Sequence, residues 1–364
     1  MHIDSPENKA LVGLTAAEID ALFAGFQQPS YRARQVYKWI HHYGVRTFEE
    51  MTNLPKPFRA ELAARFSLQT LQLATRQESI DGTIKYLWQL AGGQHIESVF
   101  IPEERRTTIC ISSQVGCALG CAFCATAQMG FLSNLSSGEI VEQVLRVQQD
   151  TGRKITNVVL MGMGEPFLNY SRVIQACRIM SDPEGLAIAA KKITISTVGV
   201  VPRIRQFADE RQPFSLAISL HAATQPLRQS IMPIADKFPL DELIDSAVYY
   251  TRKLRKRITF EYVLLDAVNH SLADARALIK LLAPLKCKLN LIPFNDTGLG
   301  FRTPSESKLK SFVDILEAKA PFAVTLRKNR GNDIAAACGQ LYAQSAADEK
   351  PRFIAAKTKA TGMV

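Results

Sequence analysis

Apolar strands alternate with helical stretches between Thr107 and about Arg327, and this alternation most restricts how the 364-residue chain can fold. The segment TTICISS is followed by five nearly continuous apolar runs: ITNVVLMGMG, KKITISTVGV, FSLAISLH, ITFEYVLLD and CKLNLIPF. Such runs are typical of parallel strands covered by helices. Six of these units predict an α/β fold, an incomplete (β/α)6 barrel rather than a closed eight-unit barrel, with FAVTLR as a terminal strand. Ser136 and Glu139 form a capping-box pair that predicts the start of one helix.

Residues 1–90 have a mostly helical pattern, and we expect them to form a small accessory domain. LTAAEIDALFAGF, YRARQVYKWIHHYG and LPKPFRAELAARF predict short helices. The strand-like segments IKYLWQL and HIESVFIP lead into the barrel, which we expect to cover residues 91–345. Residues 346–364 are expected to form a mobile basic tail.

The second predicted helix is basic and carries interleaved aromatic residues. Its side chains are Arg32, Arg34, Lys38, His41 and His42 with Tyr31, Tyr37 and Trp39. Two interpretations remain open, namely contact with RNA or an ordinary helix with a solvated charged face. The net charge of +10 and the pI near 9.3 favour an anionic partner, nucleic acid first.

Composition indicates a cytoplasmic protein without a membrane partner. No run of 18 apolar residues occurs, and the N-terminal segment MHIDSPENKA lacks the apolar core of a signal peptide. The seven cysteines have no extracellular spacing pattern, which favours a reducing cytosol.

Three cysteines lie close together in GCALGCAFCATAQMGF: Cys117, Cys121 and Cys124. Zinc sites usually pair C-x2-C with a distant second pair, and ferredoxin clusters take four cysteines. Three close thiolates can hold three irons of a 4Fe–4S cubane and leave the fourth iron open for a substrate. The alternative is three buried thiols in an ordinary loop, which the small residues around them disfavour.

Polar residues collect where the predicted strands end. They are Gly162, Gly164 and Glu165 after the second strand, Ser196 and Thr197 after the third, Ser219 and His221 after the fourth, and Asn295 after the sixth. Chemistry in barrels gathers at these strand ends. Glycines let the backbone approach a bound aminoacyl group, and a carboxylate can pair with its ammonium. Each residue alone is usually part of a turn, but together they predict a shared cofactor pocket.

The remaining cysteines have no role that spacing alone can assign. Cys110 lies on the first barrel strand, and Cys338 lies beside Gly339 in NDIAAACGQL. Cys177 and Cys287 stand among apolar neighbours, which indicates inert core thiols.

The chain resembles the RlmN/Cfr family of radical S-adenosylmethionine (SAM) RNA methyltransferases from about residue 31 to 342. The matching stretches, in order, are YRARQVYKWI, FEEMTNLPK, ICISSQVGCALGCAFCATAQMGF, NVVLMGMGEP, ISTVGVVP, SLHAATQPLR, LNLIPFN and AAACGQL. The C-x3-C-x2-C run, with Phe123 before its last cysteine, is the most specific together with MGMGEP and ACGQL.

The resemblance implies a radical SAM barrel, one 4Fe–4S cluster on the three clustered cysteines, and two SAM molecules consumed per methylation. It assigns the cofactor to Gly164, Glu165, Ser196, Ser219, Leu220, His221 and Asn295, with Leu220 contributing only backbone. It also implies a chemistry for the two unassigned thiols. Cys338 takes a methyl group from SAM, and a 5′-deoxyadenosyl radical then removes hydrogen from that methyl. The carbon radical adds to an adenine, Glu97 takes the ring proton, and Cys110 attacks the sulfur of Cys338 to free methylated RNA.

Members of this family differ in their substrate position. RlmN-type enzymes act on adenine C2 in the peptidyl-transferase region of 23S rRNA, and some also on tRNA beside the anticodon. Cfr-type enzymes act on C8 and confer antibiotic resistance. MGMGEP and SLHAA favour the RlmN type, although DTGLGFRTPSES departs from its usual Pro-rich stretch. We expect a monomer with an electron donor such as flavodoxin. A radical activase for a protein or small molecule, and a non-catalytic iron–sulfur RNA-binding protein, remain alternatives.

Overall fold

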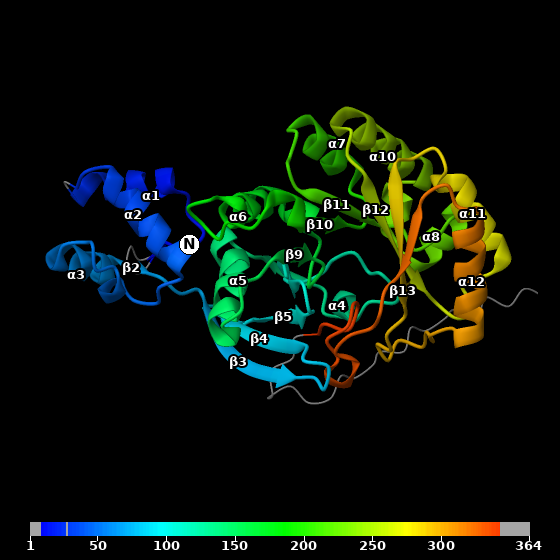
Figure 1. Cartoon of the computed structure of the whole chain (residues 1–364), viewed down its shortest axis with the longest axis horizontal. Coiled ribbons are helices and arrows are strands. Elements are labelled where there is room, and N and C mark those ends of the chain that lie inside the picture. The colour runs from blue at the N-terminus through cyan, green and yellow to red at the C-terminus, as the bar shows by residue number, and fades with distance from the viewer. Residues whose placement is uncertain (1–8, 27, 343–364) are drawn as a thin grey trace, which may run out of the picture.

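A ten-stranded sheet forms the centre of the computed structural model, which describes residues 9–26 and 28–342 (Figure 1). The strand order is β14-β13-β12-β11-β10-β9-β6-β5-β4-β3. In this sheet β6 and the strands β9 to β14 pair in parallel, whereas β5, β4 and β3 extend the sheet antiparallel. The strands are β3 Leu71–Glu78, β4 Ile84–Leu90, β5 His95–Pro102, β6 Thr107–Cys110, β9 Asn157–Leu160, β10 Ile193–Thr197, β11 Ser215–Ser219, β12 Ile258–Leu264, β13 Cys287–Pro293 and β14 Ala323–Leu326.

A helix connects each parallel strand to the next, which gives six βα units and a terminal strand. The helices are α5 Ser137–Thr151, α6 Tyr170–Ser181, α7 Val201–Asp209, α10 Leu240–Leu254, α11 Leu272–Leu282 and α12 Glu306–Lys319. The incomplete (β/α)6 barrel is therefore confirmed, and so is the capping box of Ser136 and Glu139 at the start of α5. Shorter helices are α4 Ala125–Gln128, α8 Gln225–Ile231, α9 Ile234–Lys237, and the 3-10 segments Pro166–Asn169, Ala190–Lys192 and Asn332–Ile334.

Burial explains why the two kinds of strand look different in the sequence. In β12 the five consecutive residues Phe260–Leu264 are all buried, because helices and loops cover both faces of this part of the sheet. In β4 buried and half-buried residues alternate strictly, since this antiparallel strand buries mainly one face. No helix in the described ranges is long and apolar enough to cross a membrane.

The N-terminal helices form a separate unit to one side of the barrel (Figure 1). Its elements are β1 Lys9–Ala10, α1 Ala16–Phe23, the 3-10 turn Ala24–Phe26, α2 Tyr31–Lys38, the π-helix Trp39–Tyr43, the 3-10 turn Phe48–Glu50, α3 Lys56–Arg65 and β2 Phe66–Ser67. Phe23, Phe26, Phe58 and Phe66 pack together at its centre. The helical pattern ends at Arg65, and β3 and β4 continue the barrel sheet at its edge, with β3 exposed except at Leu71. The division at residue 90 stays a prediction, and the predicted tail at 346–364 lies outside the described residues.

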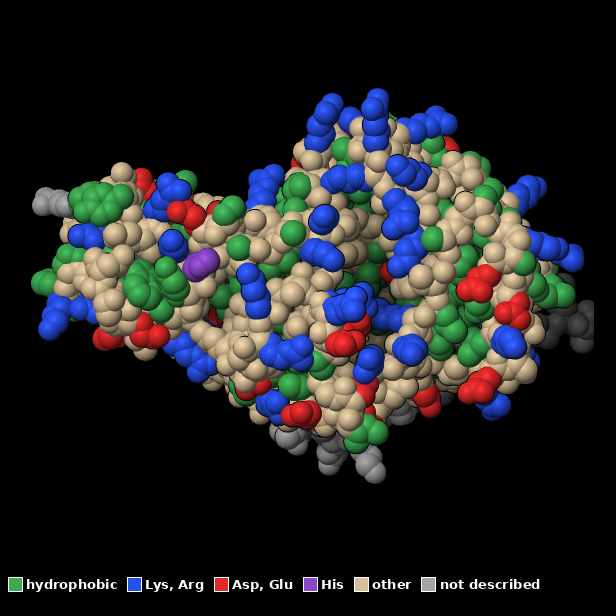
Figure 2. Space-filling model, viewed as in Figure 1, with side chains coloured by type: hydrophobic (Ala, Val, Ile, Leu, Met, Phe, Trp, Pro, Cys, Tyr) green, Lys and Arg blue, Asp and Glu red, His purple; other side chains and the backbone are tan. Residues whose placement is uncertain are grey.

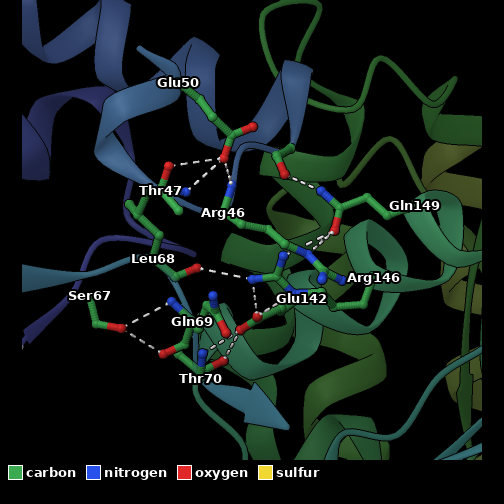
Figure 3. Close-up of polar contacts among 11 residues, drawn as sticks. Arg46, Thr47, Glu50, Ser67, Leu68, Gln69, Thr70, Glu142, Arg146 and Gln149 are labelled. Carbon is green, nitrogen blue, oxygen red and sulfur yellow. Dashed lines mark hydrogen bonds and ion pairs between the residues drawn. The ribbon is translucent and has the colours of Figure 1, made fainter. Parts of the chain in front are cut away.

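A polar contact region, which we call the interdomain seam, fastens residues 46–70 to α5 (Figure 3). The buried carboxylate of Glu142 pairs with Arg146 at 2.6 Å and accepts the backbone N–H of Thr70 at 2.5 Å. Arg146 also donates to the carbonyl of Leu68 at 3.3 Å. Gln149 accepts from Arg46 at 3.1 Å and from Arg146 at 3.0 Å.

The basic second helix also packs against the barrel. Tyr37 donates its hydroxyl to Asp182 at 3.0 Å, and Arg34 forms an ion pair with Glu184. His41 is fully buried and accepts the N–H of Gly13 on Nε2 at 2.9 Å. Some of the basic residues predicted to contact RNA or solvent therefore lie at the interface between the N-terminal unit and the barrel.

Candidate active site

The strand ends of the barrel surround one open pocket of about 780 Å³. Five of the seven predicted cofactor residues line it, together with two of the predicted cysteines: Gly164, Glu165, Ser196, Ser219, His221, Cys124 and Cys338. Leu220 is fully buried and donates its backbone N–H to the carbonyl of Glu261 at 2.9 Å. The backbone carbonyl of Leu220 in turn accepts the N–H of Ala222 at 2.8 Å. The side chain of Asn295 lies in a neighbouring pocket.

Glu165 follows β9 in a tight turn that only glycine permits at the preceding position. Gly164 has φ of +95°, and a Cβ there would lie 2.5 Å from the side chain of Gln114. The Glu165 carboxylate accepts the N–H of Phe167 and the N–H of Val198, both at 2.9 Å. Burial nevertheless raises the pKa of Glu165 to about 7. Each oxygen keeps a second lone pair, so the group can still accept a bond from a ligand ammonium.

His221 is held as a neutral imidazole with a defined tautomer. Its Nδ1 accepts the N–H of Val263 at 2.9 Å, which places the ring proton on Nε2. Burial, together with the nearby charge of Arg228, lowers the pKa of His221 to about 3. The ring of Phe123 contacts it edge-on at 4.9 Å. His221 can therefore offer a hydrogen-bond donor in the pocket without carrying charge.

The cysteine loop lies between two short strands, β7 Gln114–Gly116 and β8 Phe131–Asn134, which pair antiparallel. The backbone of Cys117 donates to Gly130 at 2.8 Å, and that of Ala122 donates to Ile231 at 2.9 Å. Burial raises the pKa of Cys121, and the thiols of Cys124 and Cys117 raise it further. The structure thus brings the three predicted thiols into one neighbourhood.

An iron–sulfur cluster fits this neighbourhood because a buried cation lies beside it. Arg228 on α8 is fully buried, and its Nε and Nη1 have no hydrogen-bond partner among the described residues. Burial lowers the pKa of Arg228 to about 10, and its interaction with Cys121 opposes that shift. In the described ranges no three His, Cys, Asp or Glu side chains are grouped to hold a metal ion. A cubane places each thiolate on a different iron, so its ligands need not converge on one point, and its negative charge suits Arg228.

Cys338 lies in a loop that packs across the cysteine loop. Ala125 donates its N–H to the carbonyl of Gly339 at 2.8 Å, and Asn295 donates to the carbonyl of Cys338 at 3.4 Å. Cys338 and Cys110 line the same pocket, next to the larger one, together with Arg327. Burial raises the pKa of Cys110 to about 12, with Cys338 as a second cause. The two thiols that sequence spacing could not assign therefore share one cavity.

Glu97 lies on β5 with a nearly buried side chain, outside the linings of both pockets. Its Oε1 is 3.3 Å from Nζ of Lys85, and its Oε2 accepts the backbone N–H of Tyr342 at 2.8 Å. Burial raises the pKa of the carboxyl, whereas Lys85 and Tyr342 oppose that shift. The predicted base is thus linked to the segment that carries Cys338.

Sequence reasoning missed three charged residues at the site. Glu261 on β12 lines the large pocket, and burial raises its pKa even though Asn290 donates to it at 2.7 Å. Arg327 faces the two thiols, and Cys338 is the main cause that raises its pKa. Arg228 lies within the family stretch SLHAATQPLR, and only its burial marks it. A signal existed for Glu261, because a carboxylate inside an apolar strand requires a reason.

Comparison with known proteins identifies two matching families along the chain. The ribosomal RNA large subunit methyltransferase N-terminal domain matches residues 9–68, and the Radical SAM superfamily matches residues 111–279. The superfamily match implies that the chain uses SAM and an iron–sulfur cluster.

Relatives match over nearly the whole length. The chain is 45% identical to a dual-specificity RNA methyltransferase RlmN of Cereibacter sphaeroides, over 96% of this chain and 93% of the relative. It is 44% identical to that of Syntrophobacter fumaroxidans, over 91% of this chain and 97% of the relative. The crystal structure of a radical SAM methyltransferase from Sphaerobacter thermophilus matches with a TM-score of 0.88 and 45% identity, over 92% of this chain and 99% of that one. The chain therefore belongs to the RlmN family of radical SAM RNA methyltransferases.

Proposed function

We propose that this enzyme methylates C2 of an adenine in the peptidyl-transferase region of 23S rRNA, and an adenine beside the anticodon of tRNA, through a methylated cysteine. The observation that carries the proposal is the shared cavity of Cys110 and Cys338 beside the strand-end pocket. Adenine C2 is electron-poor and does not attack the electrophilic methyl group of SAM. In a route with two thiols, one cysteine first accepts the methyl group and delivers its carbon to C2, and the second cysteine releases the product. The relatives named above are dual-specificity RNA methyltransferases, which supports action on two kinds of RNA.

The three thiols of the cysteine loop would hold one 4Fe–4S cluster. When bound, that cluster supplies the electron that cleaves SAM to a 5′-deoxyadenosyl radical. SAM would be held by the seven residues at the strand ends: Gly164, Glu165, Ser196, Ser219, Leu220, His221 and Asn295. Glu165 and His221 offer an acceptor and a neutral donor, which suits the ammonium and the polar groups of an aminoacyl nucleoside.

The protein side chains account for the remaining bonds. The thiolate of Cys338 attacks the methyl carbon of a first SAM and takes that methyl group, and S-adenosylhomocysteine leaves. After hydrogen is removed from that methyl, its carbon adds to C2. The adduct radical then loses one proton, to Glu97, and one electron, which would return to the oxidised cluster. The Sγ of Cys110 then attacks the Sγ of Cys338, the S–CH₂ bond breaks, and the released carbon gains a proton as methyladenine. A dithiol reductant reduces the disulfide, so a second SAM and two thiol electrons complete the cycle.

We further propose that the enzyme works as a monomer in the cytoplasm with a flavodoxin-type electron donor. Lys and Arg side chains surround a hollow on one face of the molecule (Figure 2). Such a surface suits an RNA backbone, whose binding releases counterions and weakens as salt rises.

Mass mapping of rRNA and tRNA from cells with and without this protein tests the proposal. We expect 2-methyladenine in 23S rRNA and beside the tRNA anticodon only when the protein is present. 8-Methyladenine in its place would show the Cfr-type reaction. Unchanged adenine in both RNAs would refute an RNA methylation role at these positions.

Cys110→Ala tests the covalent route. The variant should methylate Cys338 and add its carbon to adenine, because neither step uses the Cys110 thiol. The expected product is a protein–RNA adduct that resists denaturant and is absent in Cys110→Ala/Cys338→Ala. Release of methylated RNA at the normal yield contradicts the resolving role.

A further inference from the structure

Two neighbouring strands bring Lys85 and Glu97 onto one face of the sheet. Leu87 on β4 stands opposite Glu97 on β5, and Lys85 is two residues from Leu87. Residues two apart on a strand share a face, so Lys85 is a diagonal neighbour that a long side chain can reach from. The Nζ of Lys85 lies 3.3 Å from Oε1 of Glu97, and both side chains are largely buried.

The same pair holds both ends of the segment that carries Cys338. The Nζ of Lys85 donates to the carbonyl of Ala335 at 3.4 Å. The Oε2 of Glu97 accepts the backbone N–H of Tyr342 at 2.8 Å. Ala335 precedes Cys338 by three residues and Tyr342 follows it by four, so both contacts bracket the thiol. Between them, Thr126 donates to the carbonyl of Leu341 at 2.6 Å, which fixes the segment to α4.

A buried carboxylate needs a nearby cation to remain ionised. Among the described residues, the groups that act on the Glu97 carboxyl are the ammonium of Lys85 on β4 and the N–H of Tyr342 on the C-terminal segment. The N–H and carbonyl of Glu97 are engaged elsewhere, with the sulfur of Met163 and the hydroxyl of Ser112. Lys85 is therefore the one charged group in the described ranges that offsets the burial of this carboxylate.

We propose that Lys85 is a positioning residue for RNA methylation. Its ammonium keeps Glu97 ionised as the base, and its bond to the carbonyl of Ala335 holds the Cys338 segment in place. The inference rests on the proposed function, because it takes the role of Glu97 from there. A single ammonium thus couples the charge of the base to the place of the thiol that carries the methyl group. The Nζ of Lys85 contacts both Oε1 of Glu97 and the carbonyl of Ala335. A shift of this one atom therefore changes both distances.

Lys85→Met tests the inference in the cluster-loaded enzyme. We expect kcat for RNA methylation at neutral pH to fall about tenfold or more, with little change in the KM for RNA. The acidic limb of the pH profile should move up by about one pH unit, because the carboxylate loses its cation. Cys338 should also react faster with iodoacetamide, measured by peptide mass mapping before SAM is added.

Two further variants separate the charge of Lys85 from its hydrogen bond to Ala335. Lys85→Arg should restore most of kcat and the original pH profile. Lys85→Gln keeps a donor for Ala335 but has no charge, so it should shift the pH profile with a smaller change in alkylation. Arg76→Met, which removes two partly exposed ion pairs of the adjacent strand β3, one with Glu78 and one with Asp150, should change neither readout.

The control for folding is SAM cleavage by the reduced cluster, which should persist in all Lys85 variants. If Lys85→Met fails this control, Lys85→Gln carries the pH test. A wild-type pH profile and wild-type alkylation in a variant that passes overturn the inference. An unmethylated RNA with the wild-type enzyme overturns the proposed function instead, so the two failures are distinguishable.

Discussion

The interdomain seam and the strand-end site both bury charged side chains, but only the seam pairs them completely. Glu142 and Arg146 satisfy each other and the chain segment 68–70. At the site, Arg228 keeps two nitrogens and Asn295 keeps an Oδ1 without a partner in the part of the chain that the structure describes. An unpaired buried polar group lowers the free energy of unfolding by about 1–3 kcal/mol, so the site is destabilised in a way that the seam is not. The difference separates a region built for stability from one built to bind.

The largest effect expected is a loss of function at the site without a loss of stability. Cys338→Ala should abolish RNA methylation, because the variant has no thiol to accept the methyl group from SAM. The visible absorbance of the iron–sulfur cluster should be unchanged. The measurement is methyl incorporation into RNA beside the visible spectrum of the anaerobic protein. Cys177→Ala is the matched control, since that fully buried thiol lies in the core and away from the pockets. Methylation by Cys338→Ala at the normal rate rejects the thiol route.

The seam should respond in the opposite manner, with a large loss of stability. Arg146→Met leaves the fully buried carboxylate of Glu142 without its cation and should lower the free energy of unfolding by about 3–5 kcal/mol. Anaerobic urea denaturation followed by circular dichroism measures this change. Arg106→Met, at an exposed pair with Glu103, should cost about 0–1 kcal/mol. Equal effects of the two substitutions would remove the contrast between the seam and an ordinary surface pair.

Acid should weaken the N-terminal unit through His41. Burial lowers the pKa of His41 to about 4, so the folded state binds fewer protons than the unfolded state between pH 4 and 6.5. Stability is therefore present above pH 6.5 and is lost as the pH falls through this window, by at most about 1.4 kcal/mol per pH unit. His41→Gln, whose amide oxygen can accept the N–H of Gly13, should remove this part of the pH dependence. An identical pH slope in both proteins argues against a buried neutral His41.

Apart from the surface control at Arg106, the smallest effect expected is that of Arg228→Met on the cluster-free protein. Arg228 is at least as buried as Arg146, yet the substitution should cost on the order of 1 kcal/mol, because two of its nitrogens have no partner among the described residues. The same denaturation measurement compares the two arginines directly. A cost as large as that of Arg146→Met shows that Arg228 is already satisfied by the protein itself.

The sequence predicts the barrel well because each strand can be recognised from its own apolar residues. The apolar runs and the capping box of α5 need only neighbouring residues, and the structure confirms them. The contacts of Glu97 were not predictable, since Tyr342 is 245 positions away in the chain. His41 was grouped with a basic surface, but it is fully buried and contacts Gly13, which is 28 positions away in the chain. Long-range packing decides such cases, and no local pattern encodes it.

Helix α5 connects the two regions physically. It starts directly after β8, the strand that closes the cysteine loop, and its last two turns carry Arg146 and Gln149 of the seam. Fifteen residues at 1.5 Å each make a rod of about 22 Å. The buried ladder of hydrogen bonds in such a rod resists compression and bending. The length of α5 therefore sets a fixed spacing between the cysteine loop and the seam that holds the N-terminal unit.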